Sequence, residues 1–219
     1  MYSLTEENYL KALFNLADKK GGVNVKGLSK HLDIKMSTVT SMMKRLADKD
    51  LVNYESYQPL HLTEKGKKEA GLIIRKHRLT EMYLVEKMGF GWEQVHEIAE
   101  QVEHIQSTPF FDKMDTLLEF PKIDPHGSPI PDKNGRVVLK EYKRLCDCKA
   151  GETMKLCAVI NSSSDFLKFL TNRELHLGSK IKIHSIEPFD KTMVVSYGKR
   201  NESLSQTACE RLLVDKVSK

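Results

Sequence analysis

Apolar residues in the first 50 positions recur three and four residues apart, which is the spacing of one face of an α-helix. In the first run Leu10, Leu13 and Phe14 share such a face, and Gly-Gly follows the run. The pattern predicts three helices and then a two-stranded β-hairpin, at about residues 3–17, 24–33, 35–50 and 51–63. Pro59 lacks a backbone N–H, so we expect the hairpin to lie at the edge of its sheet.

Helical spacing resumes after the hairpin and gives way to alternation in the last third of the chain. Three more helices are predicted, at about residues 63–88, 92–106 and 107–120. Residues 121–144 are rich in Pro, Gly and charged residues, which is typical of a linker. Beyond them, apolar and polar residues alternate, which predicts a small β-barrel with one short helix at residues 164–172.

Net charge follows the same divisions. Residues 1–68 hold twelve Lys/Arg and eight Asp/Glu, for a net charge of +4, whereas residues 69–120 hold five and ten, for −5. A basic segment favours a polyanionic partner, and an acidic segment favours a cation. We therefore expect a mainly α chain with a small β domain, divided into a basic head, an acidic helical segment, a linker and a β-barrel, at residues 1–68, 69–120, 121–144 and 145–219.

Several common classes of protein do not fit this composition. No apolar run approaches the roughly 20 residues that span a bilayer, and the N-terminal residues are acidic without an apolar stretch, unlike a signal peptide. The four cysteines form no C-x-x-C pair. We expect a cytoplasmic protein that associates with no membrane, and we find no pattern that predicts a small organic ligand.

The order of three helices and a hairpin matches a winged helix-turn-helix, whose third helix enters the major groove of DNA. Hydroxyl side chains that suit base edges or phosphates gather at the start of that helix, and basic side chains that suit phosphates accompany them. These candidates are Lys35, Ser37, Thr38, Thr40, Ser41, Lys44 and Arg45. Ser and Thr also cap many helices, so the alternative is a three-helix domain with a solvated polar face.

Candidate metal ligands share one side of the predicted helix at residues 92–106. At 100° per residue, they fall within a 100° sector beside the apolar face: His96, Glu100, Glu103 and His104. His77 and Glu81 repeat the four-residue spacing on the preceding helix. Carboxylate and imidazole ligands without a thiolate favour Mn(II) or Fe(II) over a structural zinc site. The alternative is a helix with exposed Glu and His that binds no metal.

Two enzyme classes use similar residues. The H-E-x-x-H helix of zinc proteases needs a second histidine where this chain has Glu100, so it is excluded. A ferritin-like di-metal bundle needs Glu-x-x-His on two helices, whereas Glu100 and His104 are four residues apart. A di-metal hydrolase or oxidase stays as the alternative from another class, although no nucleophile or Gly-rich loop supports it.

Together these segments resemble the family of the diphtheria toxin repressor and the manganese transport regulator, which are metal-dependent transcriptional repressors. The resemblance covers nearly the whole chain. It includes the recognition helix and wing, the start of the dimerisation helix, the metal helix, the linker and a C-terminal SH3-like domain of the FeoA type. The motifs that carry it are STVTSMMKRLADKDLV, LHLTEKGKKEA, RKHRLTEMYL, VHEIAEQVEHIQS, PHGSPIP and CKAGETMKLCAVI with LHLGSKIKI.

The resemblance implies two metal positions per subunit. One, the ancillary position, takes His77, Glu81 and His96, and the other, the primary position, takes Glu100, Glu103, His104 and Asn8. Glu100 indicates manganese, because the iron branch has cysteine there, whereas His96 is a feature of the iron branch. Asn8 and Lys11 depart from the acidic residues of the manganese branch. In the C-terminal domain, Asp165 or Ser162 lies near the family's additional ligands.

The combined interpretation is a homodimeric repressor, activated by Mn(II) or alternatively Fe(II), that binds palindromic operator DNA and controls metal-uptake genes. A regulator that keeps its metal only for structure is the second alternative. An apolar stripe suits either the dimer interface or internal packing, and consists of Phe110, Phe111, Met114, Leu117 and Leu118.

Overall fold

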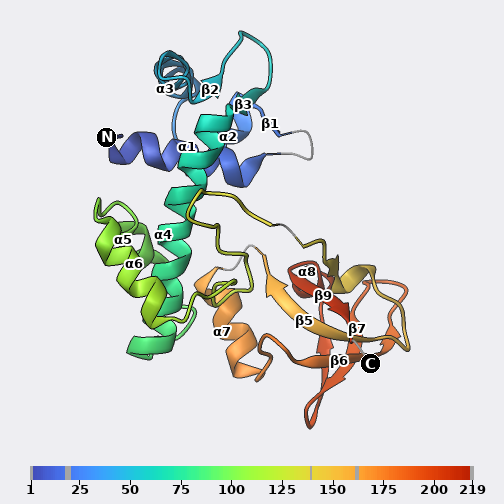
Figure 1. The fold of residues 1–219 in the computed structure, drawn as a ribbon. Helices are drawn as coiled ribbons and strands as arrows, with labels where there is room; N and C mark the ends of the chain where they lie inside the picture. Colours follow the sequence, from blue (N-terminus) through green and yellow to red (C-terminus); the bar gives the residue numbers. More distant parts are fainter. Residues whose placement is uncertain (1, 18–20, 139, 161–162, 218–219) are drawn as a thin grey trace. The chain divides into compact units, whose positions relative to one another are not determined.

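The computed structural model describes residues 2–17, 21–138, 140–160 and 163–217 (Figure 1). The chain divides into two compact units, and each is described by itself. Unit 1 comprises Met1–Thr80, Ile98–Lys122 and Ile130–Val138, and unit 2 comprises Glu81–Glu97, Ile123–Pro129 and Leu139–Lys219.

Unit 1 begins with three short helices whose boundaries follow local capping signals. They are α1 (Leu4–Leu16), α2 (Val25–Leu32) and α3 (Met36–Asp48). The Ser3 hydroxyl accepts a hydrogen bond from the Glu6 backbone N–H, and the Glu6 carboxylate accepts one from the Ser3 N–H, which forms a capping box. The Asn24 side chain caps α2 by accepting a hydrogen bond from the Gly27 N–H. The three helices predicted in the head are confirmed.

A three-stranded antiparallel sheet completes the head. Its strands are β1 (Gly22–Val23), β2 (Val52–Asn53) and β3 (Leu60–Leu62), in the order β1-β3-β2. The predicted hairpin of β2 and β3 is present, and it includes the edge strand β2, whereas β3 lies between two partners. Pro59 is compatible with this arrangement because it precedes β3 and need not donate to either neighbour.

The core of the head fixes the orientation of α3. Leu10 and Leu13 of α1, Leu28 of α2, and Val39 and Met43 of α3 are fully or almost fully buried in one cluster. Burying a side chain of this size stabilises the fold by about 1.5–3 kcal/mol. Because the apolar face of α3 is turned into this core, its opposite face is exposed to solvent.

The remaining helices of this region are α4 (Glu64–Met88), α5 (His96–Val102) and α6 (Thr108–Leu117). Helix α4 runs through both units and ends at Met88, as predicted. Helix α5 is shorter than the predicted helix at residues 92–106. The Gly91 carbonyl accepts the Gln94 N–H in a turn before it, and Ile105 bonds back to Val102 in a tighter turn after it. None of the described helices is long and apolar enough to cross a membrane.

Unit 2 is built on a six-stranded antiparallel sheet in the order β4-β9-β5-β6-β7-β8. The strands are β4 (Lys143–Arg144), β5 (Thr153–Val159), β6 (Lys180–Ile186), β7 (Met193–Tyr197), β8 (Arg200–Leu204) and β9 (Leu212–Lys216). Bulges in β5 and β6 bend the sheet. Shorter helical elements connect the strands: η1 (Leu145–Asp147), α7 (Ser164–Asn172) and α8 (Gln206–Cys209).

The stretch predicted as a linker, residues 121–144, contributes residues to both units. In unit 2, the Val159 N–H of β5 donates to the His126 carbonyl. In unit 1, Arg75 of α4 donates to the Pro131 carbonyl, and a Cβ at Gly71 would collide with the Gly135 backbone. This Pro- and Gly-rich stretch therefore makes close backbone contacts, which its composition does not reveal.

Candidate metal centre and nucleic-acid interface

Three buried side chains in unit 2 form a group with the composition of a metal site. Glu81 of α4, Asp124 and His126 are 2%, 4% and 6% exposed. One ligand atom from each lies within 4.8 Å of the others. Two carboxylates removed from water require a compensating positive charge, since an isolated buried carboxylate is strongly disfavoured. A divalent cation or a protonated histidine meets that requirement.

Hydrogen bonds orient this group as in a metal site. His126 Nε2 donates to the Trp92 carbonyl at 2.9 Å, so its Nδ1, 3.5 Å from Glu81 Oε2, carries the lone pair when the ring is neutral. A histidine ligand commonly donates its other ring N–H to a carbonyl or carboxylate in this manner. Asp124 Oδ1 accepts the backbone N–H groups of His126 and Ser128 at 2.8 and 2.9 Å. The donors therefore fit a divalent cation.

The environment of His126 acts on its pKa in two directions. Burial lowers the pKa of the imidazole, whereas the hydrogen bond and charge of Glu81, the charge of Asp124 and the Trp92 carbonyl raise it, and the net shift is upward. The group thus favours positive charge at this point in the fold.

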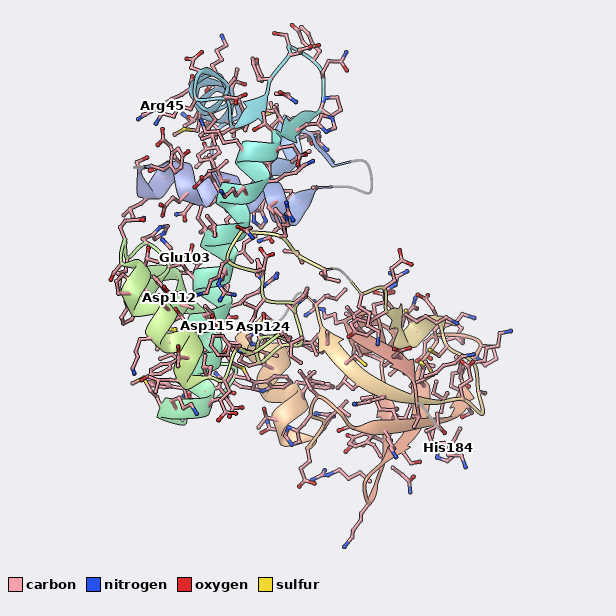
Figure 2. The ribbon with its side chains drawn as sticks, viewed as in Figure 1. Arg45, Glu103, Asp112, Asp115, Asp124 and His184 are labelled. Atoms are coloured by element: carbon pink, nitrogen blue, oxygen red, sulfur yellow. The ribbon has the colours of Figure 1, made fainter. Side chains whose placement is uncertain are left out.

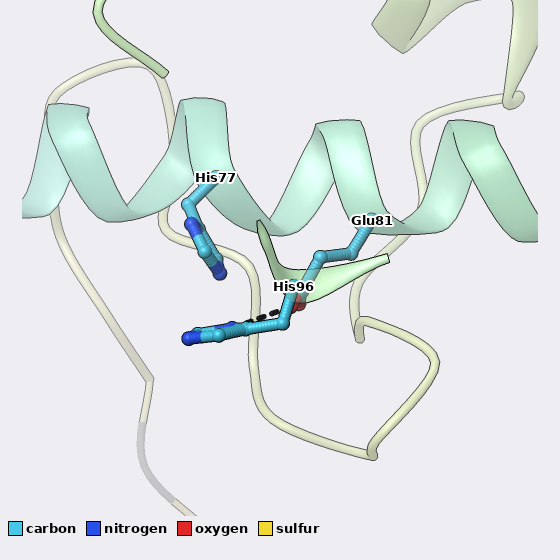
Figure 3. A group of neighbouring side chains, drawn as sticks. All are labelled: His77, Glu81 and His96. Atoms are coloured by element: carbon cyan, nitrogen blue, oxygen red, sulfur yellow. Dashed lines mark hydrogen bonds and ion pairs between the residues drawn. The ribbon is translucent and has the colours of Figure 1, made fainter. Parts of the chain in front are cut away.

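His77 and His96 bring imidazole groups to the same glutamate (Figure 3). His77 lies one turn before Glu81 on the continuous helix α4, and His96 Nδ1 is 3.2 Å from Glu81 Oε1. One ligand atom from each of the three lies within 4.8 Å of the others. His77 is buried whereas His96 is exposed. Glu81 thus belongs to two groups of potential ligands.

A glycine lets the loop of Asp124 and His126 lie against the sheet of unit 2. Gly127 has φ = +87°, and a Cβ there would meet the Cys157 carbonyl oxygen and lie 2.6 Å from Ala158 Cα. An L-residue would be strained in this conformation, and the neighbouring atoms are backbone and cannot rotate away. The loop position therefore depends on a residue without a side chain.

A second polar cluster lies in unit 1, around the end of α5. Glu103, labelled in Figure 2, is fully buried. Its Oε2 lies 2.5 Å from His77 Nδ1, and its Oε1 lies 2.6 Å from Lys11 Nζ. Lys11 also lies 3.0 Å from Glu100 Oε1, which is at the surface. Both oxygens of the buried carboxylate thus contact basic groups of this chain.

His104 meets α1 through Glu7 rather than Asn8. His104 Nδ1 lies 2.5 Å from Glu7 Oε2, and the Gln106 amide donates to Glu7 Oε1 at 2.9 Å. Glu7 is buried, whereas Asn8 is exposed. The residue of α1 that reaches this cluster is therefore one position before the residue named from the sequence.

The candidate ligands predicted to share one side of the helix at residues 92–106 do so only in part. His96 and Glu100 are exposed, Glu103 is buried, and Glu103 and His104 lie in the turn after α5. Because the helix ends at Val102, the constant advance of 100° per residue does not extend to them. Asp165 is exposed in the first turn of α7 and belongs to neither group around Glu81, and Ser162 lies outside the described residues.

The solvent-facing side of α3 carries most of the candidate DNA contacts. Thr40 is half-buried, and the other six are exposed: Lys35, Ser37, Thr38, Ser41, Lys44 and Arg45. The Ser41 hydroxyl donates to the Ser37 carbonyl within the helix. In the loop between β2 and β3, Tyr57 is fully exposed. The geometry thus presents hydroxyl and basic groups on one accessible helix.

Arg45 of α3, labelled in Figure 2, contacts a buried carboxylate of α1. Arg45 Nε and Lys49 Nζ lie 2.9 and 2.6 Å from Glu6 Oε1. Burial raises the pKa of Glu6, but hydrogen bonds from Lys49 and the Ser3 backbone and the charges of Lys49 and Arg45 lower it, with a net downward shift. The first turn of α1 is therefore linked electrostatically to the last turn of α3.

The apolar stripe of α6 divides between the core and the surface. Phe111 and Met114 are buried, Leu118 is half-buried, and Phe110 and Leu117 are 42% and 43% exposed. Internal packing therefore accounts for part of the stripe, and two large apolar side chains face solvent.

Comparison with known proteins places the chain in a family. Family models match for the iron dependent repressor N-terminal DNA binding domain, the metal binding and dimerisation domain, and the FeoA domain, at residues 1–60, 63–132 and 143–216. The HTH-type transcriptional regulator MntR of Oceanobacillus iheyensis is 32% identical over 118 residues, which cover 54% of this chain and 80% of MntR. The chain belongs to the iron-dependent repressor family. The resemblance seen in the sequence is confirmed.

Other members of the iron-dependent repressor family extend the comparison. The iron-dependent repressor IdeR of Mycobacterium tuberculosis is 34% identical over 128 residues, which is 58% of this chain. The match spans about half of the relative, at 55% of IdeR. A manganese-dependent transcriptional repressor, solved in complex with manganese, is 26% identical with a TM-score of 0.87, covering 97% of this chain and 100% of that one. The predicted fold, including its FeoA-type SH3-like domain, is confirmed.

Sequence reasoning missed three polar residues of this repressor-family chain: Glu7, Asp124 and His126. Asp124 and His126 lie in a stretch whose composition indicated a linker, and the available signal was a D-x-H pair next to a glycine. The sequence does not distinguish Glu7 as a candidate, because the first turn of α1 carries two adjacent glutamates that contact different partners.

Proposed function

We propose that this chain is a metal-activated transcriptional repressor that binds double-stranded operator DNA as a homodimer in the cytoplasm. The observation that carries the proposal is the buried group of Glu81, Asp124 and His126, whose oriented imidazole and paired carboxylates require positive charge. It occurs in a chain whose N-terminal residues match a DNA-binding domain and whose central residues match a metal-binding and dimerisation domain.

The donor chemistry favours Mn(II), with Fe(II) as the alternative. The groups around Glu81 offer carboxylate oxygens and imidazole nitrogens, and none includes a thiolate among the described residues. Hard and borderline divalent ions suit such donors, whereas structural zinc sites are usually rich in cysteine. The bound ion would supply two positive charges to a group that holds two buried carboxylates.

We propose two metal positions per subunit. The first is centred on Glu81 and draws on Asp124, His126, His77 and His96. The second is formed by Glu100, Glu103 and His104, and Glu7 is a better candidate than Asn8 for the ligand from α1, since it already contacts His104. Asp165 stays a weaker candidate, because its carboxylate belongs to neither group.

The DNA contacts are proposed to come from the exposed face of α3. Short hydroxyl side chains suit base edges, and lysine and arginine suit phosphates. A homodimer would read a palindromic operator with half-sites about 34–36 Å apart or a multiple of that distance. The exposed side chains of Phe110 and Leu117 support α6 as part of the dimer surface. The regulated genes are proposed to be those of metal uptake.

Contacts within unit 1 connect residues of the second metal position to the proposed DNA-binding helix α3. Glu7 of α1 contacts His104, and the adjacent Glu6 holds Arg45 of α3. A ligand shifts a conformational equilibrium only by its different affinity for the two states. We propose that the states differ in the position of α1, whose first turn contacts both the residues of the second metal position and α3.

The alternatives predict different results. Membership in a family of DNA-binding repressors counts against the di-metal enzyme, and a purely structural metal would leave DNA affinity unchanged once the protein is folded. Fluorescence anisotropy with a labelled palindromic promoter fragment, in chelator and in Mn(II) or Fe(II), separates these cases. We expect metal to increase DNA affinity at least tenfold, and equal affinity in chelator and metal would disprove the sensor function.

A matched pair of variants tests the metal position around Glu81. His126→Ala removes an oriented ligand, and we expect Mn(II) affinity measured by calorimetry to fall at least tenfold. His184→Ala is the control, because His184 is exposed in the same unit (Figure 2) and its Nε2 lies 2.7 Å from the Ser196 hydroxyl, away from the group around Glu81. If the two variants bind Mn(II) equally well, His126 is not a ligand.

A further inference from the structure

Lys11 contacts two carboxylates of the proposed second metal position. Its ammonium group lies 2.6 Å from Glu103 Oε1 and 3.0 Å from Glu100 Oε1, and its side chain is only 15% exposed. These carboxylates follow it in the sequence by 92 and 89 residues. A lysine ammonium donates up to three hydrogen bonds and carries one positive charge. It therefore satisfies the two carboxylates as a bound cation would.

The surrounding groups leave little need for another cation while Lys11 is in place. The second oxygen of the fully buried Glu103 contacts His77 Nδ1, and the His104 imidazole contacts Glu7. A metal that bound Glu103 Oε1 would lie within a few ångströms of the ammonium, and like charges repel strongly at such distances in a partly buried site. The metal and the ammonium group cannot share this oxygen.

We propose that Lys11 is a tethered cation that competes with the metal for Glu100 and Glu103. This inference rests on the proposed function, because it concerns the second of its two metal positions. The lysine holds α1 against the turn after α5 without metal. Mn(II) binds at this position only when the side chain swings away, so the position is weaker than the one around Glu81.

The ion pair also has a purely structural explanation, in which Lys11 only stabilises the fold. The two roles predict different results when the charge is removed. A structural ion pair predicts lower stability and unchanged metal binding. A competing cation predicts that removal of the ammonium frees two carboxylates for metal, so that binding of Mn(II) becomes tighter while the metal-free protein becomes less stable.

The test counts Mn(II) bound to the full chain, using the EPR signal of free Mn(II) during titration. Lys11→Met removes the charge and keeps an unbranched side chain. Lys67→Met is the matched control, since Lys67 pairs with Glu64 on the exposed surface of α4. We expect Lys11→Met to bind an additional Mn(II) per subunit at least tenfold more tightly than the wild type, and Lys67→Met to bind as the wild type does.

Two further measurements assign the additional ion. We expect it to disappear in the double variant Lys11→Met/His104→Ala. We also expect Lys11→Met to unfold at a lower temperature than the wild type in chelator and to regain the difference in Mn(II). If Lys11→Met is poorly folded, Lys11→Gln replaces it, because glutamine still donates to Glu103 without a charge, and the same gain is expected.

Equal Mn(II) number and affinity in the wild type and both Lys11 variants would overturn the inference. So would an additional ion that persists in the double variant with His104→Ala. The proposed function is measured separately, by the effect of Mn(II) on DNA affinity. It can fail while Lys11→Met still gains an ion, or hold while Lys11 proves to be structural.

Discussion

Gly127 offers a sharp test of how the loop of Asp124 and His126 is held. Gly127→Ala places a Cβ against the Cys157 carbonyl and 2.6 Å from Ala158 Cα, in a backbone conformation of φ = +87°. Both obstacles belong to the backbone of β5, so the loop must move. The hydrogen bond from Val159 N–H to the His126 carbonyl, 2.9 Å long, would stretch with it.

The loss of unfolding free energy in Gly127→Ala has two parts, and a variant at a second glycine measures one of them alone. Gly89 has φ = +74°, but a Cβ added there would meet no neighbouring atom within 4 Å, so Gly89→Ala carries only the left-handed backbone penalty. That penalty is about 1–2 kcal/mol. Gly127→Ala adds the cost of overpacking, typically about 1–3 kcal/mol. The expected loss of unfolding free energy is thus about 2–5 kcal/mol for Gly127→Ala, against about 1–2 for Gly89→Ala.

The chain carries its own probe for this measurement. Its single tryptophan, Trp92, stacks on His126 with ring centroids 6.0 Å apart, within unit 2. Urea unfolding followed by tryptophan fluorescence reports this unit, and calorimetry reports Mn(II) affinity. We expect Gly127→Ala to lower Mn(II) affinity by about ten- to a hundredfold, as displacement of supporting contacts does at other metal sites. We expect Gly89→Ala to leave it unchanged.

The reasoning fails if the two alanine variants lose the same stability. It also fails if Gly127→Ala is clearly destabilised but binds Mn(II) as the wild type does. In the first case the loop would tolerate a methyl group against β5, and in the second the positions of Asp124 and His126 would not depend on that packing.

Two other predictions concern charge and association. The pKa of Glu6 is lowered in the folded protein, so its contribution is present above the ordinary value of 4.5 and is lost as pH falls through the folded pKa. Glu6→Gln should lower the free energy of unfolding by about 1 kcal/mol at pH 7, and not by more, because the basic partners of Glu6 are partly exposed. Urea unfolding should show this difference disappear in acid. A difference independent of pH would contradict the reasoning. The double variant Phe110→Glu/Leu117→Glu should shift the dimer toward monomers in sedimentation velocity. The control Phe189→Glu, at a fully exposed site, should not. A double variant as dimeric as the control would exclude α6 from the interface.

Local signals in the sequence were sufficient for the head and the long helix. The capping box at Ser3, the spacing of Leu10 and Leu13, and the glycine after Met88 each act within a few residues, so they define α1 and the end of α4 without knowledge of the rest. The strands β8 and β9 carry weaker local signals. The burial pattern of β8 includes one buried residue, Leu204, and β9 follows a short helical turn.

The polar site could be predicted only in part, because its members meet through tertiary contacts. Helical spacing, a local property, gave His77, Glu81 and His96 as candidate ligands, and the family resemblance placed them in one group. Asp124 reaches Glu81 from 43 positions away, through a loop held by backbone hydrogen bonds that composition does not reveal. The contact of Glu7 with His104 spans 97 positions and depends on how α1 is rotated about its axis.

The adjacent glutamates in the first turn of α1 contact two different parts of unit 1. Neighbouring residues on a helix point 100° apart, and here one carboxylate holds α3 while the next holds the turn after α5. A rotation of α1 that shortens one of these contacts must change the other. Because Glu6 and Glu7 are adjacent in the chain, we expect a substitution that rotates α1 to alter both contacts together.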